Sequence, residues 1–210
     1  SAFALSLADL TQQDATGGLK DALTQGAQIA VKQLGTPGGF SNNEAVRIEL
    51  PGNLGKVART MKMMGMGAEI EQLETSMNLA AEAAVPQAQA LLVSAVKKMT
   101  VQDAKSILSG PQDSATQYLN KSSREQIRAK FLPIVKRATD QVGLAQQYNS
   151  FAGQAASFGA LDAKSANIES YVTEQALDGL FEIIAQQEAN IRQNPAGAAT
   201  SLAKKVFGAL

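Results

Sequence analysis

The sequence contains no cysteine and no histidine in 210 residues. These absences exclude thiolate nucleophiles, disulfides, zinc sites built from Cys and His, Ser-His-Asp triads and histidine general bases. Catalysis would therefore depend on carboxylates, lysine, tyrosine or serine. A lack of cysteine suits a reducing cytosol and an oxidising periplasm equally, so it does not identify the compartment.

The chain also lacks an excess of charge and a long apolar run. Its 19 basic and 19 acidic residues cancel, so no overall positive field favours nucleic acid or an anionic membrane, and we expect no nucleic-acid partner. The longest apolar stretch, 88–96, is interrupted by Gln89 and Ser94. It is far shorter than the roughly 18 residues that span a bilayer, which predicts no transmembrane segment.

What remains is a chain with 45% hydrophobic residues, enough for one core, and we expect a single domain over residues 1–210. Segment 1–11 is expected to be a flexible N-terminal part of it. The first residue is Ser1 rather than Met, which suits a chain from which a signal peptide has been removed.

Apolar residues recur at spacings of three and four along most of the chain, the pattern of amphipathic helices. Long helices are predicted over 12–34, 68–98 and 168–193, with Pro86 breaking or kinking the second and Pro133 kinking another. Shorter helices are predicted over 115–119 and after two capping-box spacings, Thr100 to Asp103 and Ser122 to Glu125. The sum is an all-α bundle of about eight to ten helices.

One stretch departs from the helical pattern. In VRIELPG, Val46, Ile48 and Leu50 alternate with Arg47 and Glu49, which predicts one short edge strand before a proline. The preceding GTPGGF, 35–40, lacks the lysine and the following helix of a nucleotide-phosphate loop. The sequence therefore predicts no cofactor.

Several motifs resemble a bacterial family catalogued as domain of unknown function 4197. They are MNLAAEAAVPQA, TVQDAKSILSGP, ATQYL, and YVTEQALDGLFEIIAQQEANIRQNP followed by KKVFG. The resemblance covers nearly the whole chain but implies no activity and no catalytic residue. It does imply an exported protein of Gram-negative bacteria with an N-terminal signal peptide, in some members of lipoprotein type, and hence a periplasmic location.

Asn78 and Glu82 are the first candidate site, because they lie four residues apart on one helical face, with Glu74 a turn earlier. Aligned polar groups beside alanines can bind a cation or the polar head of a ligand. The alternative is structural: the face is solvated, or Glu82 caps or pairs with a group on a facing element, as burial would require.

Other candidates each have a simpler alternative. Met61, Met63, Met64 and Met66 are soft ligands for Cu(I), or they fill irregular gaps at a helix end. Arg128 shares a basic face that attracts lipid phosphates or an acidic partner, or that is simply solvated. Tyr118 and Tyr148 supply hydroxyls to a pocket, or each finds one internal hydrogen-bond partner.

The leading hypothesis is a non-enzymatic periplasmic or envelope-associated domain that binds a hydrophobic or amphipathic small molecule, or an envelope protein, between kinked helices. Peripheral membrane association is compatible with it. The first alternative is a metal-dependent enzyme using Glu74, Glu82 and Asp103. The second is a self-associating structural protein, for which an exposed apolar stripe around Val206 and Phe207 would be the sign.

Overall fold

The computed structural model describes residues 11–52, 59, 62–141, 145, 146, 148, 149, 167–198 and 200–210. The described part is all-helical, as predicted, and contains no strand. Its α-helices are α1 (Gln12–Leu34), α3 (Gly67–Ala84), α4 (Gln89–Lys97), α5 (Val101–Leu108), α6 (Ser114–Thr139), α8 (Ile168–Gln193) and α9 (Ser201–Gly208). Shorter helical turns are η2 (Lys62–Met66), η3 (Val85–Ala88) and η5 (Pro195–Gly197).

Seven α-helices in the described residues are fewer than the eight to ten expected. One reason is that the two helices predicted around 115–119 and after Ser122 form a single helix, α6. The hydroxyl of Ser122 donates to the carbonyl of Tyr118 at 2.8 Å, and that of Ser123 to Leu119 at 2.5 Å. Because both hydroxyls bond back to the preceding turn, neither caps a new helix.

The two prolines behave differently. At Pro86 the predicted break is present, because α3 ends at Ala84 and a 3₁₀ turn, η3, leads into α4. Pro133 lies inside α6, which continues to Thr139. The predicted capping box of α5 is confirmed: Thr100 Oγ1 accepts from the Asp103 N–H at 3.1 Å, and Asp103 accepts from the Thr100 N–H at 3.0 Å.

The chain forms two compact units. Unit 1 comprises Ser1–Lys32, Ala88–Gln126 and Leu180–Leu210, and unit 2 comprises Gln33–Gln87 and Ile127–Gly179. Helices α6 and α8 are each divided between the two units, α6 after Gln126 and α8 after Gly179. The expectation of a single domain stays a prediction, and the predicted flexible segment lies, apart from Thr11, outside the described residues.

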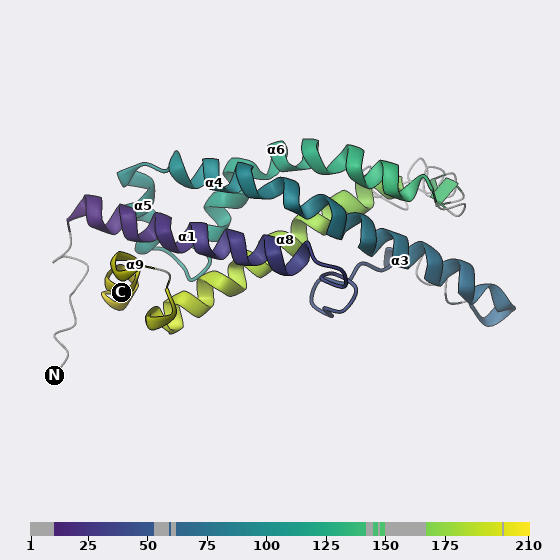
Figure 1. Ribbon diagram of the computed structural model, residues 1–210, viewed down its shortest axis with the longest axis horizontal. Coiled ribbons are helices and arrows are strands. Elements are labelled where there is room, and N and C mark those ends of the chain that lie inside the picture. Colours follow the sequence, from purple (N-terminus) through teal and green to yellow (C-terminus); the bar gives the residue numbers. More distant parts are fainter. Residues whose placement is uncertain are drawn as a thin grey trace. The chain divides into compact units, whose positions relative to one another are not determined.

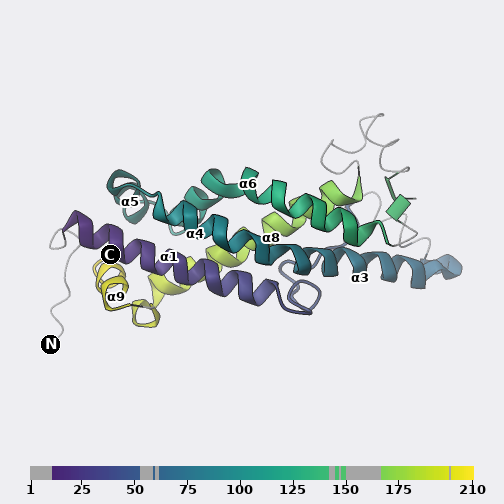
Figure 2. The same cartoon turned by 45° about the horizontal axis from the view of Figure 1, so that its top comes forward.

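In unit 1, α9 packs beside the first turns of α1, as both views show (Figure 1, Figure 2). The approach is close because α1 carries glycines there: a Cβ on Gly18 would lie 2.4 Å from Val206 Cγ2 and 2.9 Å from the Leu202 carbonyl oxygen. Glycine therefore sets the distance at which α9 docks. The apolar residues of this core include Leu19, Leu23, Leu92, Leu119, Leu180, Val206 and Phe207.

Unit 2 contains α3, the second part of α6 and the first part of α8. Its buried apolar residues include Phe40, Ile48, Ile70, Leu73, Met77, Ile127, Phe131, Ile168 and Leu177. Gly179 lets α8 pass close to the loop that follows α1, because a Cβ there would lie 2.8 Å from Phe40 Cε1. This loop, residues 35–50, contains the stretch that was predicted as a strand.

One described stretch, Gly67–Lys97, is long and apolar enough to cross a membrane by length and composition alone. Half of its most apolar window is buried inside the protein, and core helices of soluble proteins meet the same criterion. The expected absence of a transmembrane segment stays a prediction.

Candidate functional site

Asn78 lies on the buried face of α3 and binds the backbone of the extended segment after α1. Its Oδ1 accepts from the Ile48 N–H at 2.9 Å, and its Nδ2 donates to the Ile48 carbonyl at 2.9 Å and to the Glu74 carbonyl at 2.8 Å. The carboxamide thus pairs with Ile48 as a neighbouring strand would. This pairing holds residues 47–51 against α3, although they belong to no helix or strand.

Glu82, one turn further along α3, is held by three backbone N–H groups. Oε1 accepts from Gly38 at 3.1 Å, and Oε2 accepts from Phe40 at 3.0 Å and Ser41 at 3.2 Å. Only 5% of Glu82 is exposed. Three charge-assisted bonds offset the cost of burying the carboxylate.

The glycines of GTPGGF shape this cradle. Gly38 has φ +84°, a left-handed conformation that turns its N–H towards the carboxylate. Gly39 lies against the end of α1, where a Cβ would approach the Leu34 carbonyl oxygen to 2.4 Å. The loop is therefore an anion-binding nest for a carboxylate of its own chain. The geometry of Asn78 and Glu82 favours the structural alternative, and ligand binding by them stays a prediction.

A second buried glutamate fastens unit 1 in the same way, and sequence reasoning did not single it out. Glu188 on α8 accepts from the backbone N–H groups of Ala115 and Thr116 at 3.1 and 2.9 Å and from the Thr116 hydroxyl at 2.7 Å. These N–H groups belong to the first turn of α6, where N–H groups have no helical carbonyl to bind. Glu188 therefore caps α6 from another helix.

Arg192 completes this cluster one turn along α8. It forms an ion pair with Glu188, with Nη2 3.0 Å from Oε2, and Nη2 also donates to the Ile107 carbonyl and the Ser114 hydroxyl at 3.2 Å. Its guanidinium lies 5.8 Å from the centroid of the Phe207 ring. The QQEANIR segment thus holds the ends of α5, α6 and α9 together.

The remaining predicted ligand residues have internal partners. Arg128 pairs with Glu174, with Nε 2.5 Å from Oε1. Tyr148 is buried and stacks on Tyr171 with ring centroids 6.4 Å apart. The Tyr118 hydroxyl lies 3.4 Å from Asp103 Oδ2, and burial, with the Asp103 charge, raises the pKa of Tyr118. Tyr118 belongs to unit 1 and the other candidates to unit 2.

Two further ionisable groups of unit 2 are perturbed by burial. The Tyr171 hydroxyl donates to the Glu49 carbonyl at 2.5 Å, and burial raises the pKa of Tyr171 to about 12. Burial also raises the pKa of Glu74, against the opposing effect of Lys62, whose Nζ is 3.7 Å away. Neither group faces a described cavity.

The methionine cluster lies around η2. Met63 and Met64 are 89% and 75% exposed, next to the kink at Gly65, where φ is +87°. Met61 and the Met66 side chain lie outside the described residues, so the copper site stays a prediction. Among the side chains that the structure does describe, no three Asp or Glu residues are grouped to hold a metal ion.

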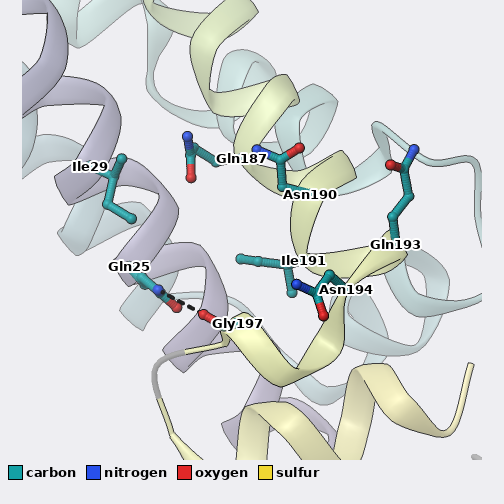
Figure 3. Close-up of a pocket in the computed structure, with 8 residues that line it drawn as sticks. All are labelled: Gln25, Ile29, Gln187, Asn190, Ile191, Gln193, Asn194 and Gly197. Atoms are coloured by element: carbon teal, nitrogen blue, oxygen red, sulfur yellow. Dashed lines mark hydrogen bonds between the residues drawn. The ribbon is translucent and has the colours of Figure 1, made fainter.

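The described cavity is a groove of about 410 Å³ in unit 1, between α1 and the end of α8 (Figure 3). Ile29 and Ile191 supply its apolar surface. The other lining residues are Gln25, Gln187, Asn190, Gln193, Asn194 and Gly197. No lining residue is charged.

The carboxamides of the groove differ in how they are bonded. Gln25 Nε2 donates to the Gly197 carbonyl at 3.3 Å, while its Oε1 is buried without a partner. Gln187, Asn190, Gln193 and Asn194 have no side-chain hydrogen bond to any residue of the described chain. Sequence reasoning missed these residues because Asn and Gln on a helix look like an ordinary solvated face.

Comparison with known proteins gives a family and no closer relative. Neither a curated protein nor a solved structure matches the chain. The family model described as "Protein of unknown function (DUF4197)" matches residues 9–208. The chain, with its buried Asn78, Glu82 and Glu188, therefore belongs to the DUF4197 family of proteins of unknown function.

Proposed function

We propose that this protein is a non-enzymatic binding domain of the bacterial envelope, and that its ligand lies in the groove between α1 and α8. The ligand class is an amphipathic small molecule or a segment of a protein partner. The observation that carries the proposal is the lining: two isoleucines form an apolar floor, and four carboxamides around it have no hydrogen-bond partner in the described chain.

The groove has the size and chemistry of a recognition site. Ligand pockets usually measure about 300–1,000 Å³ and combine apolar walls with a few polar groups that orient the ligand. The cavity of about 410 Å³ lies in this range. Each free carboxamide offers two donors and an acceptor, so the rim can satisfy a polar edge while Ile29 and Ile191 cover an apolar one.

The carboxylates considered for an enzyme are occupied by structural contacts. Glu82 binds three backbone N–H groups, and Asp103 caps α5 through Thr100. Glu74 pairs with Lys62. These contacts within the chain support a binding role over an enzymatic one.

Two considerations support the envelope location and a role other than self-association. Family resemblance implies export, and the absence of cysteine is compatible with an oxidising periplasm. The C-terminal stripe that would favour self-association is covered: Val206 is fully buried and Phe207 is 4% exposed.

The test is native mass spectrometry of protein purified from the periplasm of its source, with lipid extraction and metal analysis of the same sample. Gly197→Leu is the blocking variant, because a Cβ at Gly197 meets only Asn194 Nδ2, at 3.9 Å. Gly208→Leu is the matched control, because it adds the same side chain where nothing lies within 4 Å.

We expect a bound mass on the wild-type protein and on Gly208→Leu, and its loss from Gly197→Leu. A clean apoprotein mass in all three samples would contradict the proposal. A ligand that Gly197→Leu retains would place binding elsewhere and would contradict the assignment of the groove.

A further inference from the structure

Two methionines on the turn before α3 are exposed to solvent. Met63 is 89% exposed and Met64 is 75% exposed. Gly65 follows with φ +87°, which bends the chain, and a Cβ on Gly65 would meet no atom within 4 Å. The two thioether side chains therefore project from a bend with open space around it, and they contribute almost no packing to the core of unit 2.

The other methionines whose side chains the structure describes are buried. Met77, on α3, has no exposed surface, and Met99, after α4, is 3% exposed. The chain thus holds an exposed pair and a buried pair of the same side chain. A reagent that attacks thioether sulfur from solvent reaches the exposed pair first.

Methionine carries all the sulfur of this chain. The sequence has six methionines and no cysteine, and it also lacks histidine and tryptophan. In a protein with exposed thiols an oxidant is shared between thiol and thioether, but here no thiol competes. Among the described side chains, we therefore expect a two-electron oxidant to react first at Met63 and Met64.

The oxidation balances with a hypohalous acid alone. The sulfur lone pair attacks the chlorine of hypochlorous acid and displaces hydroxide. Hydroxide then attacks the sulfonium sulfur, chloride leaves, and loss of a proton gives the sulfoxide. Sulfur is oxidised, chlorine is reduced to chloride, and an apolar side chain becomes a polar one.

The position of each methionine determines what this change does to the fold. A sulfoxide at Met77 would place an oxygen without a hydrogen-bond partner in the core, which is costly. At Met63 and Met64 water hydrates the new oxygen. The same exposure lets a methionine sulfoxide reductase enclose the side chain, and two thiols then return the sulfoxide to the thioether, forming a disulfide and water.

We propose that Met63 and Met64 are a reversible oxidation site for hypohalous acids, which react there while Met77, Met99 and the fold stay intact. The surface of the bend is apolar in the reduced protein and polar in the oxidised one. This inference does not involve the groove between α1 and α8, so it is independent of the proposed function and fails or succeeds separately.

The experiment treats the full chain with limiting hypochlorite and stops the reaction with free methionine. Tandem mass spectrometry of the tryptic peptides then measures the sulfoxide fraction at each methionine. Met77 and Met99 are internal standards. The control is chain that is digested before the treatment, in which burial no longer distinguishes the methionines.

We expect sulfoxide to form about tenfold or more faster at Met63 and Met64 than at Met77 and Met99, because a buried sulfur reacts only after local opening. The difference should disappear in the digested control. Both stereospecific reductases, supplied with a thiol, should restore the thioethers. Equal rates at all four methionines of the folded chain, or sulfoxides that the reductases leave in place, would overturn the inference.

A pair of variants tests whether the fold tolerates a polar group at the bend. Met63→Gln/Met64→Gln should change the Tm by less than about 2 °C, as expected for exposed positions. Met77→Gln is the matched control, because it places the same amide at a fully buried position and should lower the Tm several times more. A double variant as unstable as Met77→Gln would contradict the proposal.

The same peptides report on the site in the cell. Protein isolated from source cells after brief exposure to hypochlorite should carry sulfoxide at Met63 and Met64. It should lose this sulfoxide during recovery while protein synthesis is blocked. Sulfoxide that does not form at these positions, or that persists through recovery, would overturn the proposal of a reversible site.

Discussion

Replacing Glu82 is the strongest test of how unit 2 is held together. Its carboxylate receives N–H groups from Gly38, Phe40 and Ser41 at 3.0 to 3.2 Å, and it is 5% exposed. In Glu82→Gln the amide is expected to place its oxygen at the position that accepts two N–H groups. The third N–H then faces an NH₂ group, and the remaining two lose the assistance of the negative charge.

The magnitude follows from these contacts. A hydrogen bond to a charged group contributes about 1.5–3 kcal/mol, and a buried donor left without a partner costs about 1–3 kcal/mol. We therefore expect Glu82→Gln to lower the free energy of unfolding by about 2–4 kcal/mol. Glu82→Ala orphans all three donors and should cost more, about 3–6 kcal/mol.

The assay is urea unfolding followed by circular dichroism, combined with hydrogen exchange at Gly38, Phe40 and Ser41. The control is Glu71→Gln, an exposed glutamate on the same helix, which should change stability by less than about 0.5 kcal/mol. A Glu82→Gln variant as stable as this control, with unchanged protection at the three amides, would refute the reasoning.

Three further predictions concern other contacts. Gly18→Val should destabilise the docking of α9 by about 1–3 kcal/mol, because the added Cβ would lie 2.4 Å from Val206 Cγ2. Thermal unfolding measures the loss of stability, with Gly208→Val as the control variant. Glu188→Gln should cost about 2–4 kcal/mol and increase hydrogen exchange in the first turn of α6, whereas unchanged exchange would refute its capping role. Burial raises the pKa of Glu74, so the folded state binds the proton more tightly and stability falls as pH rises through the interval between its unfolded and folded pKa values. Between pH 4 and 7, the urea midpoint of Glu74→Gln should increase relative to that of the wild type as pH rises. Midpoints that change in parallel with pH would contradict this.

The helices were predictable because their signals are local. Apolar spacing predicted α1, α3 and α8, and Pro86 and the Thr100 capping box fixed two boundaries from a few neighbouring residues. The split of α6 was wrong because Ser122 and Ser123 can bond either to a following N–H or to a preceding carbonyl, and the sequence does not decide between them.

The partners of the buried polar residues were not predictable. Asn78 binds backbone groups 30 residues away and Glu82 binds a loop up to 44 residues away. The sequence does not show which backbone N–H groups will bind a side chain. The helical spacing could therefore identify the polar face but not its partner. Gly38 and Gly39 of GTPGGF were the available signal, since a turn with positive φ, here at Gly38, often gathers N–H groups around an anion.

The groove was missed for a different reason. Its residues come from α1 and from the end of α8, and only packing brings Gln25 and Ile29 opposite Gln187 and Asn194. Neutral carboxamides have no shifted pKa and no metal-ligand spacing, so no chemical motif marks them. A groove of this kind becomes visible only when the side chains are placed in space.

The central claim is that the groove between α1 and α8 is occupied in the cell. Its most direct test is site-specific photocrosslinking in intact source cells, with a benzophenone side chain at Asn190, in the groove, or at Gln13, exposed near the start of α1. The account predicts a discrete adduct from Asn190 that disappears when Gly197→Leu fills the groove, and no such adduct from Gln13. The same adducts from both positions, or an adduct that survives Gly197→Leu, would contradict it.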